Sequence, residues 1–126
     1  MSEETPRTYG LRFTPRAAAD IDAAHARFIE LSSEELADEW KAGLFDAVAP
    51  LSTMPHRQIA PENARFQQEV RQLIYRRRTG SVAYRILFTI VESQEDAPHV
   101  RILHVRHGSA RPITRAEARD IEANGN

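Results

Sequence analysis

The chain has 126 residues, of which 41% are hydrophobic and 28% are charged, with a formal net charge of −1 and no cysteine. This size and composition predict one globular domain over residues 1–126, and the lack of cysteine excludes disulfide frameworks and thiolate metal sites. No apolar run approaches the roughly 18 residues of a membrane span and the polar N-terminus lacks the apolar region of a signal peptide, so we expect a cytoplasmic protein outside the membrane.

The first part of the chain predicts a strand followed by a helix. Alternating β-forming residues at positions 9–14 indicate the strand. Thr14 followed by Pro15 is typical of a helix N-cap with proline at the first helical position. The helix is expected to run to about residue 31, with one stripe at helical spacing formed by Ala18, Ile21, His25 and Phe28.

A second helix should begin directly afterwards, because Ser32 and Glu35 have the spacing of a capping box. Apolar residues then recur at intervals of three and four before Met54-Pro55: Leu36, Trp40, Leu44, Val48 and Leu51. Two helices joined so tightly form an αα-hairpin. We expect Trp40 to be mostly buried between this hairpin and a sheet.

The sheet is predicted in the second half, after a proline-bounded loop at residues 55–61. Strands are expected at residues 69–77, 81–92 and 99–106, with a turn at Thr79-Gly80. The middle one has apolar residues on both faces and should be central. Thr114 and Glu117 cap a short final helix. The order predicts an α+β fold, in which an αα-hairpin packs on an antiparallel-rich four-stranded sheet that the N-terminal strand joins in parallel.

Short motifs run through the chain in a fixed order. They are Phe13-Thr14-Pro15 with Ala18, Asp20 and Ile21; Trp40; the Pro55 loop; Val70-Arg71-x-Leu73; Tyr84-Arg85-Ile86-Leu87-Phe88; and Ile102-Leu103-x-Val105-x-His107-Gly108-x-Ala110-Arg111. Together they resemble the RelE/ParE superfamily, the toxins of bacterial type II toxin–antitoxin (plasmid stabilisation) systems, and the resemblance covers residues 9–111.

The resemblance implies a toxin that inhibits growth until a cognate antitoxin protein binds it, as a homodimer or as a hetero-oligomer with the antitoxin. ParE-like members inhibit DNA gyrase without catalysis, whereas RelE-like members cleave mRNA on the ribosome without a metal, so no cofactor is implied in either case. RelE-like active sites usually carry lysines and a late tyrosine. Here Lys41 is the sole lysine and no tyrosine follows Tyr84, which favours gyrase inhibition over the endoribonuclease alternative.

Three residues are candidates for catalysis if the chain cleaves RNA. The guanidinium group of Arg85 could bind two oxygens of the scissile phosphate, or it could pair with a carboxylate such as Glu69. His107 could transfer protons near neutral pH, with Glu69 as the second member of an acid–base pair. The alternative is that His107 fixes the turn at Gly108 by hydrogen bonding.

Basic residues are concentrated in the second half, where residues 64–126 carry a net charge of +4 against −5 for residues 1–63. The candidates for contacting a nucleic acid or a protein target are Arg71, Arg76, Arg77, Arg78, Arg106 and Arg111. The first four are expected to form a basic stripe that leads into the hairpin turn. Such a stripe can bind phosphates, or it can be a solvated strand edge that discourages aggregation.

Overall fold

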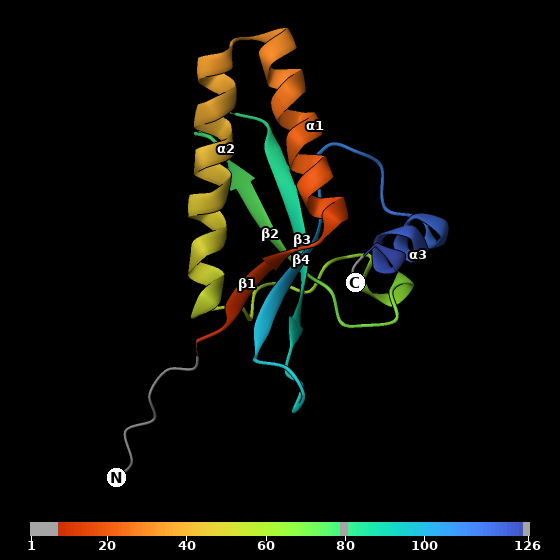
Figure 1. Cartoon of the computed structure of the whole chain (residues 1–126). Coiled ribbons are helices and arrows are strands. Elements are labelled where there is room, and N and C mark those ends of the chain that lie inside the picture. Colours follow the sequence, from red (N-terminus) through yellow and green to blue (C-terminus); the bar gives the residue numbers. More distant parts are fainter. Residues whose placement is uncertain (1–7, 79–80, 125–126) are drawn as a thin grey trace.

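A helical hairpin and a short C-terminal helix pack on a four-stranded sheet in the computed structural model, which describes residues 8–78 and 81–124 (Figure 1). The elements in chain order are β1 (Gly10–Phe13), α1 (Pro15–Leu31), α2 (Glu34–Val48), the 3₁₀ turns η1 (Ala49–Ser52) and η2 (Asn63–Arg65), β2 (Arg71–Arg76), β3 (Ala83–Val91), β4 (His99–His107) and α3 (Arg115–Ala123). The α+β class is confirmed. None of the helices in the described ranges is long and apolar enough to cross a membrane.

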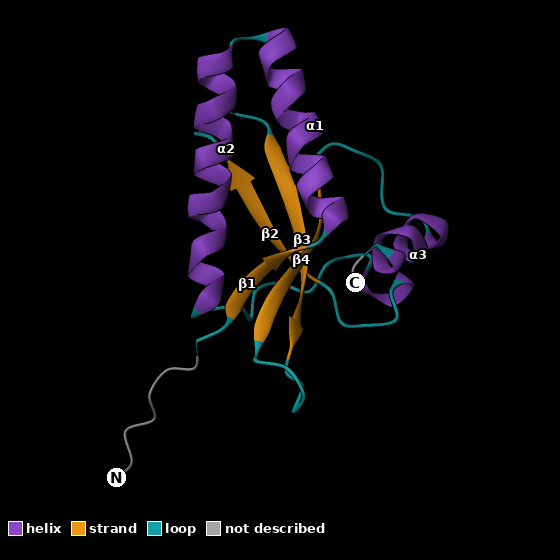
Figure 2. Cartoon of the chain, in the orientation of Figure 1, coloured by secondary structure: helices purple, strands orange, loops and turns teal. Residues whose placement is uncertain are grey.

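The sheet has the strand order β1-β4-β3-β2 (Figure 2). β1 pairs parallel with β4, and the other two pairings are antiparallel. Two predictions are therefore confirmed: the N-terminal strand joins the sheet in parallel, and the strand predicted at residues 81–92, which is β3, is central. β3 begins at Ala83 rather than at residue 81, and the predicted turn at Thr79-Gly80 lies outside the described residues.

The start of α1 follows its sequence signal, because the Thr14 hydroxyl accepts a hydrogen bond from the Ala17 N–H at 3.1 Å. The stripe prediction was wrong at one position: Ala17 is buried and Ala18 is exposed. The inward phase of the helix is set by Ala17 and Ile21, and a shift of one residue rotates a side chain by about 100°.

The predicted cap of α2 was also wrong by one residue. Ser33, not Ser32, is the N-cap, and its hydroxyl accepts from the Leu36 N–H. The Ser32 N–H donates instead to the Phe28 carbonyl at 2.8 Å and so ends α1. Adjacent serines thus serve the end of one helix and the start of the next.

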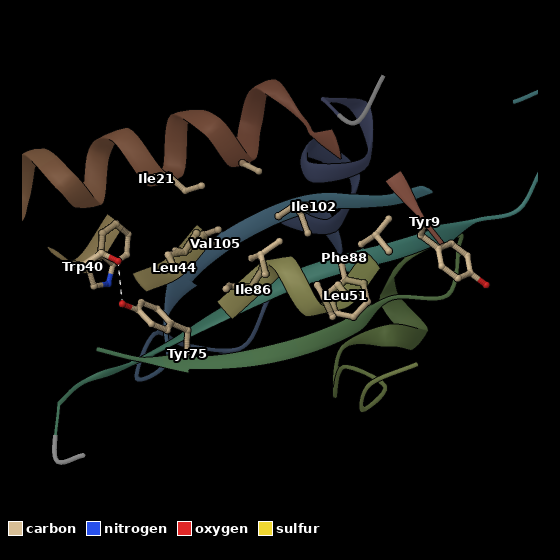
Figure 3. Close-up of a cluster of buried hydrophobic side chains, with 13 residues drawn as sticks. Tyr9, Ile21, Trp40, Leu44, Leu51, Tyr75, Ile86, Phe88, Ile102 and Val105 are labelled. Atoms are coloured by element: carbon tan, nitrogen blue, oxygen red, sulfur yellow. Dashed lines mark hydrogen bonds between the residues drawn. The ribbon is translucent and has the colours of Figure 1, made fainter. Parts of the chain in front are cut away.

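The main core lies between the hairpin and one face of the sheet (Figure 3). Trp40 is 1% exposed there, as predicted. Its ring lies 5.3 Å from that of Phe28 and 5.0 Å from that of Tyr84. The Tyr75 hydroxyl donates to the Trp40 carbonyl at 2.9 Å, which joins the edge strand β2 to α2.

A second core covers the opposite face of the sheet. Leu87 and Leu103 contribute from β3 and β4, and the cover comes from α3 and the segment before β2. The covering residues are Ala60, Phe66, Val70, Ile113, Ala118 and Ile121. The sheet is therefore sandwiched between the hairpin and a thinner layer that includes α3, which explains why β3 is apolar on both faces.

A β-bulge interrupts the pairing of β3 with β4. Leu87 pairs with His104 but Phe88 pairs with Ile102, so β4 has one extra residue, Leu103. An extra residue reverses the alternation of side chains beyond it. As a result, Arg106 shares the α3-side face with its partner in the register, Arg85.

Candidate functional site

Arg85 is the central polar side chain on the α3 side of the sheet, and all of its nitrogen atoms have partners. Its Nη1 and Nη2 donate to the two carboxylate oxygens of Glu62 at 2.9 and 2.5 Å. Its Nε donates to Gln72 Oε1 at 3.1 Å. This two-pronged pairing of guanidinium and carboxylate is the strong geometry of such pairs.

Glu62 was not singled out from the sequence, although it is only 4% exposed. Its carboxylate also accepts from the Ile113 N–H at 3.0 Å. The hydrogen bonds from Arg85 outweigh the opposing effect of burial, and with the Ile113 N–H they lower the pKa of Glu62 from 4.5 to about 2. One carboxylate therefore ties together the loop after Pro61, the sheet and the segment that leads to α3.

The expectation that Glu69 pairs with Arg85 was wrong. The Glu69 carboxylate instead contacts Arg71 at 2.8 Å, and the Glu69 carbonyl accepts from Thr89. Thr89 lies five residues along β3 from Tyr84, which pairs with His107, so this separation is about 16 Å at the rise of a strand. Glu69 and His107 therefore lie near opposite ends of the sheet and are not brought together as an acid–base pair.

His107 ends β4 and holds the chain that follows it. Its Nδ1 accepts from the backbone N–H of Ser109 at 3.2 Å and lies 2.6 Å from the Ser109 hydroxyl. Because a backbone N–H can only donate, Nδ1 carries no proton in this arrangement, and neutral His107 holds its proton on Nε2. These contacts are those expected of a histidine that fixes the turn.

Gly108 is required at this turn by a close approach of two backbones. Its N–H donates to the Ala83 carbonyl at 2.7 Å, and a Cβ added at Gly108 would lie 2.8 Å from that carbonyl oxygen. The glycine thus lets the end of β4 close against the start of β3.

A groove of about 740 Å³ crosses this end of the sheet. Its polar lining includes Arg76, Arg85 and His107, and its apolar lining includes Ile74 and Val82. Among the predicted catalytic residues it therefore brings Arg85 and His107 together, without Glu69. Glu62 opens onto a separate hollow beside it.

The arginines in β2 and directly after it do not form the expected single stripe. Arg77 faces the hairpin and pairs with Glu39 at 3.3 Å, whereas Arg76 lines the groove and donates to the Ser81 carbonyl at 2.6 Å. Arg71 lies at the far end of the strand, and Arg78 is exposed. Successive side chains of a strand point to opposite faces, so neighbouring arginines are divided between them.

Arg106 and Arg111 both meet Glu117, the residue that forms the predicted capping box with Thr114. Arg111, which is exposed, hydrogen-bonds to one carboxylate oxygen, and Arg106 Nη1 lies 3.7 Å from the other. The pKa of Glu117 is lowered from 4.5 to about 2, first by the Arg111 hydrogen bond. Arg106 is thus turned toward α3, and Arg111 is the more accessible of the two.

A buried contact between α1 and β4 was not predicted from the sequence. The Asp20 carboxylate accepts from His104 Nδ1 at 2.6 Å and from the Val105 N–H at 3.0 Å, with Arg16 at 3.6 Å. It anchors the hairpin to the sheet just beyond the bulge. Within the described ranges, no three His, Asp or Glu side chains are grouped as metal ligands would be.

Two of the comparisons with known proteins gave a match. A family model described as the ParE toxin of the type II toxin–antitoxin system parDE matches residues 11–112. The fold is similar to a solved structure of a chromosomal ParDE toxin–antitoxin system from P. aeruginosa, with a TM-score of 0.59 and 22% identity over 80% of this chain and 97% of that one. No curated protein sequence matches the chain.

Proposed function

Because this chain belongs to the ParE toxin family of type II toxin–antitoxin systems, we propose that it inhibits growth by binding DNA gyrase and that it does so without catalysis. The gyrase target comes from the likeness to ParE toxins. The chain's own side chains supply the argument against its alternative, cleavage of mRNA on the ribosome.

The observation that carries the proposal is the pairing of Arg85. To stabilise a scissile phosphate, this guanidinium would have to direct N–H groups at the phosphate oxygens. Its donors are already directed at Glu62 and Gln72. Releasing them would leave a carboxylate that is 4% exposed without its cation, and uncompensated buried charge of this kind costs about 3–5 kcal/mol.

The other candidate residues support the same proposal. His107 Nδ1 accepts a hydrogen bond from the Ser109 N–H, so this nitrogen is not available to accept a proton from a substrate. Glu69 lies too far along the sheet to assist. Lys41, the sole lysine, is in α2 and approaches Asp22 at 3.8 Å.

The partner that would neutralise the toxin is a small antitoxin. Its C-terminal segment is expected to be disordered alone and to fold on the toxin, because an extended chain can then cover a large surface. The groove with Ile74 and Val82, which are 47% and 52% exposed, offers apolar anchors beside Arg76. An acidic segment with apolar side chains fits this surface.

The test adds purified protein to gyrase acting on plasmid DNA and, separately, to ribosomes translating a defined mRNA. We expect inhibition of gyrase, relief by the antitoxin encoded beside the toxin, and intact mRNA. Arg85→Ala and His107→Gln should then weaken inhibition only as far as they weaken folding. Cleaved mRNA, lost on either substitution with unchanged stability, would instead establish the nuclease.

A further inference from the structure

Two arginines of α3 have no partner inside the protein. Among the arginines that the structure describes, only Arg27, Arg78, Arg115 and Arg119 form neither an ion pair nor a side-chain hydrogen bond. The last two lie one turn apart on α3, which packs across the sheet from the hairpin (Figure 1). Like charges at this spacing destabilise a helix, and a cation in the first turn, where Arg115 stands, opposes the helix dipole. The stability of the fold therefore does not explain these two arginines.

The acidic residues of α3 do not neutralise them. Glu117 is bonded to two other arginines, one from β4 and one from the loop that follows it. The Glu122 carboxylate accepts from the Gln67 N–H at 3.0 Å. Asp120 is exposed, but it points about 100° around the helix axis from Arg119. Most of the negative charge of α3 is thus used inside the fold, whereas its positive charge faces the solvent.

The two free arginines share the flank of α3 that borders the segment before β2. They lie three and seven residues before Glu122, a spacing that places side chains on one side of a helix, and Glu122 contacts Gln67 of that segment. The same segment adds Arg65, an exposed residue whose guanidinium donates to a carbonyl just before α3. Arg65, Arg115 and Arg119 are here called the basic flank.

The basic flank offers charge without an apolar anchor. Every exposed large apolar side chain in residues 8–78 and 81–124 lies outside α3 and outside residues 61–70. Protein interfaces gain most of their affinity from buried aromatic and apolar anchors, whereas binding to a nucleic-acid backbone depends on cations. A guanidinium can bind two oxygens of one phosphate. Arg115 and Arg119 are about 6 Å apart along the helix axis, so each can reach a phosphate of its own.

We propose that the basic flank binds the phosphate backbone of the DNA on which gyrase acts. The inference rests on the proposed function and adds the DNA itself to the surfaces that the toxin contacts. Phosphate contacts carry no information about base sequence, so the flank holds the toxin on a gyrase–DNA complex of any sequence. Because α3 lies across the sheet from the hairpin, the hairpin stays free for contacts with protein.

Two double variants with the same change in charge test the phosphate contacts. Arg115→Gln with Arg119→Gln removes the two contacts, and Arg27→Gln with Arg78→Gln removes two unpaired arginines elsewhere. Binding of each toxin to a complex of gyrase and DNA is measured over a range of salt concentrations. Loss of two phosphate contacts should lower the slope of log affinity against log salt by about 1.8. It should also raise the toxin concentration for half inhibition of supercoiling about fivefold.

The control pair should match the parent in both measurements. Both double variants should keep the urea midpoint of the parent, because all four side chains are exposed. A loss of inhibition in the α3 pair then reflects binding and not folding.

A single introduced cysteine identifies what the flank touches, because the chain has none of its own. Ala123→Cys places a photo-activated cross-linker one turn after Arg119, at an exposed position that leaves the three arginines intact. Ala26→Cys, at an exposed alanine of α1, is the matched control. In the complex with gyrase, the first should cross-link to DNA and the second should not.

The outcomes separate this inference from the proposed function. Cross-linking of Ala123→Cys to a gyrase subunit instead of DNA, an unchanged salt slope in the α3 pair, or an equal loss of binding in both pairs overturns the basic flank and leaves gyrase inhibition intact. If the parent does not bind gyrase, the proposed function fails and a labelled duplex alone decides the flank. Binding of the duplex at low salt that only the α3 pair loses supports the DNA contact, and no binding overturns it.

Discussion

Glu62→Gln is the substitution that most directly tests how this protein holds its sheet. The change keeps the shape of the side chain but removes the charge that faces Arg85. Both side chains are almost inaccessible, with 4% of Glu62 and 12% of Arg85 exposed. Removing one member of a buried pair leaves the other uncompensated and costs about 3–5 kcal/mol in the free energy of unfolding.

The pH dependence gives an independent magnitude for the same interaction. The folded-state pKa of Glu62 is about 2 against an ordinary 4.5. Since the folded-state value is the lower one, the ionised carboxylate stabilises the fold above pH 4.5, and this contribution is lost as the pH falls toward 2. It amounts to about 3 kcal/mol at pH 7 and about 1–1.5 kcal/mol at pH 3.

The assay is urea denaturation of the parent and the variant at pH 7 and pH 3. The difference in unfolding free energy between the two proteins should narrow by about 2 kcal/mol at the lower pH. Other carboxylates such as Glu117 are present in both proteins and cancel in this comparison. Glu69→Gln is the matched control, because its side chain is 59% exposed and paired with Arg71, and it should change stability by less than about 0.5 kcal/mol. An equal difference in unfolding free energy at pH 7 and pH 3 would refute the argument that the ionised Glu62 carboxylate stabilises the fold.

Three further substitutions test the packing around the sheet by the same denaturation assay. Gly43→Ala would place a Cβ 2.2 Å from the Tyr75 hydroxyl and should destabilise by about 1–3 kcal/mol despite alanine's better helix propensity; a gain in stability would contradict this close approach of α2 and Tyr75. Gly108→Ala should cost a similar ~1–3 kcal/mol by pushing on the Ala83 carbonyl, and an unchanged urea midpoint would show that the turn can shift. Asp20→Ala removes an acceptor shared by a histidine and a backbone N–H of β4 and should cost about 1–3 kcal/mol, whereas a neutral result would mean that water replaces the carboxylate.

One helix boundary and one helix face differ from those expected because two local signals competed at each of them. Either of two adjacent serines could cap α2, and the choice depended on which N–H was needed to end α1. The inward face of α1 could begin at Ala17 or at Ala18, and the sheet beneath it selected Ala17. Local patterns therefore located each helix but left its ends and phase uncertain by about one residue.

The candidate site was predicted only in part. Arg85 lies in a strand that is apolar on both faces, where a guanidinium needs a partner, and pairing with a carboxylate was one of the two roles expected for it. Glu69 was the acid that we named from the sequence, but the partner was Glu62, from an irregular loop without periodicity. Loop residues carry no pattern that states which strand they will face.

The sequence by itself determined the order of elements, the hairpin, the central strand and the burial of Trp40, because periodicity and capping are local properties of the chain. Tertiary structure alone decided the arrangement of charges. The extra residue Leu103 reversed the alternation of side chains along β4 and placed Arg106 on the same face as Arg85. The loop before β2 brought the Glu62 carboxylate into contact with Arg85. Such pairings depend on register and on contacts between distant segments, which no local pattern encodes.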